Sequence, residues 1–179
     1  MSRRLISAAI ALLTLSTAPA LAEVKSATPG GFEVGGSVTI SAPPARVWAV
    51  LSTPDAWWSR DHRWFSHSVL SLDLAPGGCW CEKAADGRTS RHLETALVEP
   101  GSRLVLRGGL GPLQGQGATG GLTFDIKTQN GVGGEGSILT WSYIVGGYAP
   151  GGLEAWAGPV DGVLSAQLAS LKTRAEAVD

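Results

Sequence analysis

The chain has 179 residues, of which 44% are hydrophobic and 16% are charged, and its formal net charge is −1 at pH 7. This length fits one domain with a substantial buried core, because domains usually contain about 100 to 200 residues. The 14 Lys and Arg residues are scattered along the chain, which argues against nucleic acid or anionic lipid as a partner. The two cysteines are too few for the disulfide framework of a small secreted scaffold, so stability must come from the core.

Residues 1–22 have the pattern of a secretory signal peptide. Arg3 and Arg4 precede an apolar run over residues 5–15, and the small-x-small triplet Ala20-Leu21-Ala22 follows. The run is shorter than the about 20 apolar residues that a membrane-spanning helix needs. We therefore predict cleavage after Ala22, a mature protein that is periplasmic or secreted, and no membrane span in that mature protein.

A lead-in, a strand and short helices are expected next. Residues 23–31 are predicted to be flexible and to precede a single domain over residues 32–179. Apolar and polar residues alternate over 32–41, which predicts a half-buried strand. Pro43-Pro44 suits a first helical turn, so a short helix is expected there, with a further turn through residues 57–58.

The rest of the chain predicts six strands and a final helix. Residues 69–74 and 79–83 flank a Pro-Gly turn, as do residues 92–98 and 103–107. Apolar residues mark one face of each of the next two strands: Leu122, Phe124 and Ile126, then Leu139, Trp141, Tyr143 and Val145. Apolar residues recur at three-and-four spacing in a helix over about residues 152–177. This order predicts an α+β fold in which a curved antiparallel sheet closes over one helix, with a cavity between them.

Several segments resemble the SRPBCC superfamily, which is also called START-like or Bet v 1-like. They are VTISAPPARVWAVL at 38–51, AWW at 56–58, LAPGG at 74–78, VEPGSRLVL at 98–106 and QLASLK at 167–172. The chain is most similar to the branch that contains Hsp90 ATPase activator homologue 1-like proteins and polyketide cyclases. The resemblance implies the helix-grip fold, in which the sheet wraps around a long C-terminal helix and short helices follow the first strand. It implies a cavity but no particular activity, because function resides in the site rather than in the fold.

Aromatic side chains are the main candidates for ligand binding. Trp57, Trp58 and Trp64 are close in sequence to His62, and aromatic groups with polar tips suit a pocket for apolar or ring-bearing molecules. Inward residues of the sheet and one residue of the last helix are expected to line the same cavity: Trp80, Phe124, Trp141, Tyr143 and Trp156. For the cluster at 57–65, a second small core beneath a loop is an equally simple interpretation.

Glu82 and His92 are the candidates for acid-base catalysis. Together with Glu94 they are expected on the same face of adjacent strands, where a buried carboxylate beside a histidine has a shifted pKa and can transfer a proton. Solvated strand residues explain the same pattern. The register of the two strands decides between these interpretations.

Cys79 and Cys81 are expected on one face of their strand, with Trp80 and Glu82 on the other. Our first interpretation is a pair of small thiols, packed or at the surface, because a disulfide across one residue is strained in an extended chain. A disulfide is the second interpretation. A metal or redox site is the third, because no closed set of four ligands accompanies the pair.

The sequence predicts no cofactor. GVGGEG at 131–136 matches the glycine pattern of dinucleotide-binding proteins by letter, but it leads into a strand rather than a helix. We expect a flexible hairpin loop at this place.

The predicted function is that of an exported protein that holds a small hydrophobic or aromatic molecule between the sheet and the last helix. The first alternative is an enzyme of polyketide cyclase or hydrolase type in the same cavity, with Glu82 or His92 as acid or base. The second alternative is an interaction domain like the Hsp90 activators, which the predicted export disfavours because their partner is cytosolic. The sequence by itself names neither the ligand nor a protein partner.

Overall fold

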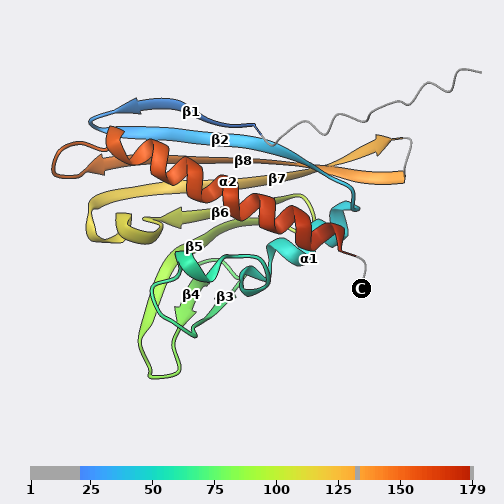
Figure 1. Cartoon of the computed structure of the whole chain (residues 1–179), viewed down its shortest axis with the longest axis horizontal. Helices are drawn as coiled ribbons and strands as arrows, with labels where there is room; N and C mark the ends of the chain where they lie inside the picture. The colour runs from blue at the N-terminus through green and yellow to red at the C-terminus, as the bar shows by residue number, and fades with distance from the viewer. Residues whose placement is uncertain (1–20, 132–133, 178–179) are drawn as a thin grey trace, which may run out of the picture.

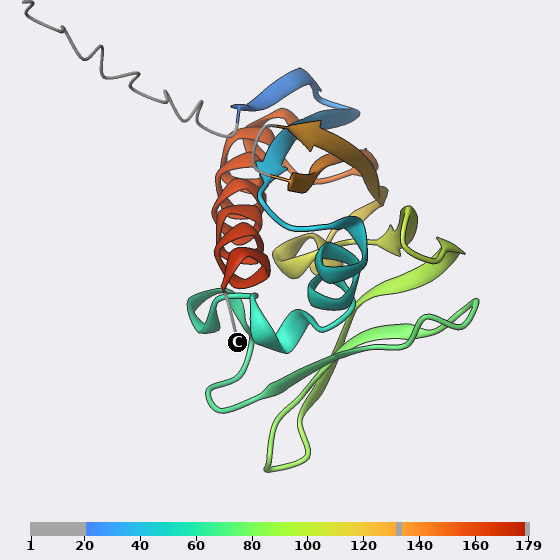
Figure 2. The same cartoon turned by 90° about the vertical axis from the view of Figure 1, so that its right-hand side faces the viewer.

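The computed structural model describes residues 21–131 and 134–177 (Figure 1). Within this part of the chain, one antiparallel sheet has eight strands in the order β1-β2-β8-β7-β6-β5-β4-β3. The long helix α2 (Glu154–Glu176) lies across one face of the sheet, and Figure 2 shows the sheet curving past it. The predicted α+β helix-grip architecture is confirmed. Residues 1–20 of the predicted signal peptide lie outside the described residues.

Most strands pair with their neighbours in sequence. In chain order they are β1 (Leu21–Thr28), β2 (Gly31–Ile40), β3 (Val69–Leu72), β4 (Cys79–Lys83), β5 (Thr89–Glu99), β6 (Arg103–Gly108), β7 (Gly117–Gly131) and β8 (Gly134–Tyr148). The exception is the long-range pairing of β2 with β8, which places Phe32 opposite Val145. The glycine-rich segment at 131–136 leads from β7 into β8, and Gly131 pairs with Gly134. Residues 132–133 of this segment lie outside the described part.

Residues 23–31 are not the flexible lead-in that we predicted. Residues 21–28 form β1, an edge strand that pairs antiparallel with β2. The prediction was wrong because side chains 23–30 are all exposed, so no alternation of buried and exposed residues marks the strand. Its backbone pairing with β2 holds it in place instead. Cleavage after Ala22 would leave residues 23–28 of this strand.

Short helices follow β2, as predicted. Helix α1 (Pro44–Leu51) begins with Pro44. Backbone N–H groups in the first turn of a helix have no intrahelical acceptor, so a proline without an N–H is tolerated there. The 3-10 helices are η1 (Pro54–Ala56), η2 (Arg60–His62) and η3 (Gly111–Gly115). Helix α2 continues through Pro159 without interruption.

The core lies between α2 and the face of the sheet that it covers. Central strands contribute inward side chains that are almost fully buried: Val34, Leu122, Phe124, Leu139, Trp141 and Tyr143. Helix α2 contributes one buried stripe: Ala157, Leu164, Leu168, Leu171 and Ala175. No helix among the described residues combines the length and the hydropathy that crossing a membrane requires.

Candidate functional site

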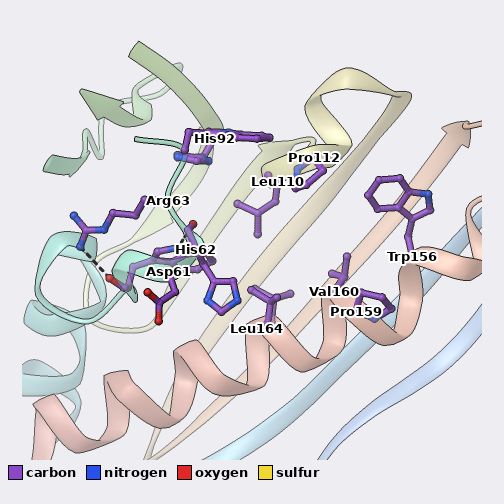
Figure 3. Close-up of a pocket in the computed structure, with 14 residues that line it drawn as sticks. Asp61, His62, Arg63, His92, Leu110, Pro112, Trp156, Pro159, Val160 and Leu164 are labelled. Carbon is purple, nitrogen blue, oxygen red and sulfur yellow. Dashed lines mark hydrogen bonds between the residues drawn. The ribbon is translucent and has the colours of Figure 1, made fainter. Parts of the chain in front are cut away.

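A pocket of about 330 Å³ opens beside the N-terminal half of α2 (Figure 3). One wall comes from α2 and is apolar: Trp156, Pro159, Val160, Val163 and Leu164. The other walls come from the segment after η1, from β5 and from the region of η3: Trp58, Asp61, His62, Arg63, Trp64, His92, Leu110, Gly111 and Pro112. Small-molecule sites usually measure about 300 to 1,000 Å³ and combine apolar walls with a few polar groups. This pocket has that composition and lies at the lower end of the range.

Trp58 belongs both to the pocket wall and to a buried aromatic cluster. Its ring packs edge-to-face on Trp57 and Trp80, with centroid distances of 5.6 and 5.1 Å. Its Nε1 donates to the carbonyl oxygen of His62 over 3.0 Å. Each such aromatic pair contributes about 0.5 to 1.5 kcal/mol beyond the burial of its area. The cluster therefore connects the pocket with β4, which carries Trp80.

Arg63 holds the segment between α1 and β3 in shape. Its side chain is only 2% exposed, and it donates to the Asp55 carboxylate over 2.6 Å. It also donates to the carbonyl oxygens of Trp58 and Ser68 over 2.9 and 3.0 Å. The backbone N–H of Leu70 and the guanidinium of Arg63 hold the pKa of Asp55 below its usual value. No motif in the sequence marks Arg63, because two of its partners are backbone carbonyl groups.

Gln167 on α2 orients the ring of His62. The amide is buried, and its Oε1 accepts from the backbone N–H of Ser59 over 2.7 Å. Its Nε2 donates to His62 Nδ1 over 3.0 Å, so the neutral imidazole carries its proton on Nε2. Nothing in the sequence marks Gln167 as a site residue, because it lies beside Leu168 and Leu164 in the apolar stripe of the helix.

Glu82 is fully buried beneath the pocket and accepts several hydrogen bonds. Its carboxylate receives the backbone N–H groups of Trp64 and Phe65 over 3.0 and 2.8 Å. The hydroxyl of Ser68 donates over 2.7 Å, and Nε2 of His92 lies at 2.8 Å. Burial raises the pKa of Glu82, but these hydrogen bonds, led by that of Ser68, outweigh burial and hold the pKa below its usual value. Glu82 is therefore a carboxylate at neutral pH.

His92 connects this carboxylate with the pocket, because its ring forms part of the wall. A carboxylate only accepts hydrogen bonds, so Nε2 of the neutral ring carries the proton and Nδ1 accepts, 3.4 Å from Nε2 of Gln114. Burial lowers the pKa of His92, and Glu82 raises it only in part. The ring is therefore neutral at pH 7 and able to accept a proton. The same ring also lines a second, polar hollow of about 390 Å³ that includes Gln114.

A β-bulge at His92 decides which side chains of β5 face inward. Trp80 and Cys81 are consecutive in β4, but they pair with Leu93 and Arg91, so His92 is an extra residue of β5. His92 and Leu93 are consequently both buried, although they are neighbours in sequence. Bulges of this kind redirect side chains and reverse the alternation beyond them.

Glu94 does not join Glu82 and His92 on one face, contrary to our expectation. It is exposed, and its carboxylate pairs with Arg91 at 3.1 Å. The prediction assumed uninterrupted alternation along β5, which the bulge at His92 breaks. The expected approach of His92 to Glu82 is present, with Nε2 of His92 at 2.8 Å from the carboxylate.

Four of the nine residues predicted to bind ligand line the pocket: Trp58, His62, Trp64 and Trp156. Five are buried in the core instead and do not line it: Trp57, Trp80, Phe124, Trp141 and Tyr143. These five side chains pack together in the core, whereas the open space lies beside the N-terminal half of α2. Tyr143 is satisfied within the core, since its hydroxyl donates to Gly108 over 2.8 Å and accepts from the N–H of Leu110 over 3.0 Å. Burial raises the pKa of Tyr143 to about 12.

Cys79 and Cys81 form a disulfide, which was our second interpretation rather than our first. Their Cα atoms are 5.2 Å apart, whereas two steps of a regular strand span about 6.6 Å. Contraction of β4 therefore removes the obstacle on which our first interpretation was based. Trp80 and Glu82 are buried on the opposite face, as expected.

Among the described residues, no three His, Cys, Asp or Glu side chains gather in a way that could hold a metal ion.

Several solved structures share this fold. An uncharacterized protein from Rhizobium leguminosarum has 20% sequence identity and a TM-score of 0.54, covering 89% of this chain and 99% of that chain. CalU16 from Micromonospora echinospora has 16% identity and a TM-score of 0.54, over 91% of this chain and 88% of that chain. The di-domain ARO/CYC protein BexL of the BE-7585A biosynthetic pathway has 20% identity and a TM-score of 0.55, over 85% of this chain and 52% of that chain. At these identities the similarity establishes the fold alone.

A family model also matches this chain, whereas no curated protein does. The model is described as polyketide cyclase / dehydrase and lipid transport, and it matches residues 32–176. The match spans the domain from β2 to the end of α2 and agrees with the resemblance seen in the sequence. The chain thus belongs to the polyketide cyclase/dehydrase and lipid transport family of the SRPBCC superfamily.

Proposed function

We propose that this protein binds a small hydrophobic or aromatic molecule in the pocket beside α2. The observation that carries the proposal is the apolar wall of α2 facing Trp58 and Trp64 across a space of about 330 Å³. Burial of apolar surface favours binding by about 25 cal/mol per Å², before the cost of ordering the ligand is subtracted. The family description, which includes lipid transport, is consistent with an apolar ligand.

Two histidines supply the polar contacts that orient such a ligand. Gln167 occupies Nδ1 of His62, which leaves its Nε2–H as a donor. Glu82 occupies Nε2 of His92, and Nδ1 accepts from Nε2 of Gln114 over 3.4 Å, a long hydrogen bond that a ligand donor can replace. A ring-bearing molecule with a hydroxyl or carbonyl group fits this combination better than a pure hydrocarbon does, because the polar nitrogens would otherwise lose their partners.

The pocket is tested by filling it. Val163 lines the pocket, whereas Ala166 is exposed on the same helix and provides the matched control. We expect Val163→Trp to weaken binding of an environment-sensitive apolar dye at least about tenfold, while Ala166→Trp leaves the affinity within about twofold. Equal affinities in the two variants would contradict binding at this place. Native mass spectrometry of protein from its own source would identify the retained molecule.

An enzyme of polyketide cyclase or hydrolase type in the same pocket is the second candidate. The Glu82–His92 pair favours it, because a neutral histidine oriented by a buried carboxylate is a suitable general base. In this candidate His92 removes a proton from the bound molecule, and Glu82 stabilises the imidazolium that forms. The test is whether the wild-type protein turns over a substrate and whether His92→Gln abolishes this turnover while dye binding is retained. That result would favour the enzyme over the binding protein.

Export of the protein is part of the proposal. It is supported by the charged start, the apolar run and Ala20-Leu21-Ala22 in the sequence. N-terminal sequencing of protein recovered from the periplasm or medium should begin at Glu23. Exported protein that begins at Met1 would contradict cleavage after Ala22. Recovery of the protein from the cytosol alone would remove export from the proposal, and the cytosolic interaction role would regain weight.

A further inference from the structure

The disulfide and the β-bulge lie opposite each other on neighbouring strands. Cys79 pairs with Glu94 and Cys81 pairs with Arg91, so two steps of β4 face three steps of β5. The disulfide spans those two steps of β4. The extra residue of β5, enclosed by the same two pairs, is His92.

The lengths of the two strands explain this coincidence. Two steps of a regular strand span about 6.6 Å and three span about 10 Å. The bridged Cα atoms are only 5.2 Å apart, so the disulfide shortens β4 where β5 is already too long. The extra length of β5 is accommodated by the β-bulge at His92. The bulge turns the His92 side chain inward, beside Glu82.

A second connection runs through Trp80, the residue between the two cysteines. Trp80 is buried, and its ring centroid lies 5.1 Å from that of Trp58, which forms part of the pocket wall. Residues 79–81 are therefore connected with the pocket in two ways. Trp80 packs against Trp58, and the disulfide lies opposite His92 on the neighbouring strand.

The disulfide has little effect as a staple for the whole chain. It closes a loop of only three residues, and the stabilisation gained by restricting the unfolded chain grows with loop length. Its main effect is consequently on the local geometry of β4.

We propose that the Cys79–Cys81 disulfide positions His92, so that reduction of this bond releases the His92–Glu82 pair and weakens ligand binding. This inference rests on the proposed binding function and adds redox control to that site. The reductant is a dithiol, one thiolate of which attacks a cysteine sulfur and breaks the S–S bond. The attacked cysteine is then held in a mixed disulfide with the dithiol, while the other cysteine has left as a thiolate. The second thiol of the dithiol displaces the attacked cysteine from the mixed disulfide. The dithiol leaves as a disulfide, having passed two electrons and two protons to the cysteines.

The test compares the oxidised protein with protein reduced by dithiothreitol. The sequence has only these two cysteines, so the reductant changes a single bond. Nitrogen NMR of the histidine side chains reports the hydrogen bond of His92, and dye binding reports the pocket. His62 is an internal control, since Gln167 on α2 holds it rather than β4. The Cys79→Ser/Cys81→Ser variant provides the open form without reductant.

We expect reduction to shift the Nε2 signal of His92 and to leave the signals of His62 in place. Dye affinity should fall about tenfold, because a displaced His92 ring changes the wall of the pocket in which the dye binds. The double variant should match the reduced protein, both with and without dithiothreitol.

Three outcomes would overturn the inference. They are unchanged His92 signals after reduction, a shift of His92 with unchanged dye affinity, and unfolding of the whole protein, since the bond would then act on the entire fold. Failure of the proposed function is distinguishable from these. If the oxidised protein binds no dye, the binding function is refuted, while the His92 signals still decide whether the disulfide positions the ring.

Discussion

Nε2 of His92 lies 2.8 Å from a carboxylate oxygen of Glu82, and both side chains are buried. The carboxylate also accepts hydrogen bonds from residues 64, 65 and 68. These bonds hold its position independently of the histidine. Of the two, only His92 lines the pocket. Glu82 is thus a positioning residue, and His92 is the group that a bound molecule can touch.

Replacing Glu82 with Gln should lower the pKa of His92 further. Burial already lowers this pKa, and the hydrogen bond and charge of Glu82 oppose that effect. Titration of the His92 ring by NMR measures the change. Glu94→Gln is the control, because Glu94 is an exposed carboxylate on the same strand. A His92 pKa that rises in Glu82→Gln would contradict the assignment of the pair.

The protein should lose stability in acid in two stages. The folded-state pKa lies below the ordinary value of 6.5 for His92 and below 4.5 for Glu82. In each window the unfolded chain binds more protons than the folded protein, so the free energy of unfolding falls as the pH falls. The first loss is expected below about pH 6.5 and the second below about pH 4.5. Urea unfolding across this range measures both, and His92→Gln should remove the first.

Replacing Gln167 with Met should destabilise the protein by about 1 kcal/mol, the lower end of the cost of leaving a donor without its acceptor, because the donor here is only partly buried. The orphaned donor is the backbone N–H of Ser59, and the ring of His62 loses its partner as well. Gln129 is exposed, so Gln129→Met is the matched control with an expected change below about 0.5 kcal/mol. Chemical denaturation measures both variants. Similar losses in the two would show that the amide of Gln167 has no special role.

Two arginine–aspartate pairs of equal length should differ in their contribution to stability. Arg63 and Asp55 are 2.6 Å apart with the arginine buried, whereas Arg103 and Asp125 are 2.6 Å apart with the arginine exposed. Arg63→Met should cost about 3 kcal/mol, because it leaves the part-buried carbonyl oxygens of Trp58 and Ser68 without their donor as well as removing the ion pair. Arg103→Met should cost less than about 1 kcal/mol. Thermal unfolding tests the difference, and equal costs would mean that Arg63 does not hold its segment in shape.

The order of strands and helices could be predicted because their signals are local. Alternation over residues 32–41 and three-and-four spacing in the last helix correspond to β2 and α2. The edge strand β1 escaped prediction because its side chains face solvent and only its backbone pairing defines it. Arg63 and Gln167 escaped because their partners are backbone groups or residues far away in the sequence.

The sequence by itself determined the order of strands and helices, since this order follows from periodicity over a few residues, and its resemblance to the SRPBCC superfamily implied the helix-grip fold. It offered the approach of Glu82 to His92 and a pocket near the aromatic segment as hypotheses, each beside a simpler alternative. The tertiary structure alone decided the bulge that separates Glu94 from His92, the disulfide at Cys79 and the placement of the pocket. The physical reason is that these features depend on how lengths and volumes match between elements. The alternation of a strand can be read from its own residues. A difference in length between two neighbouring strands arises only when they pair.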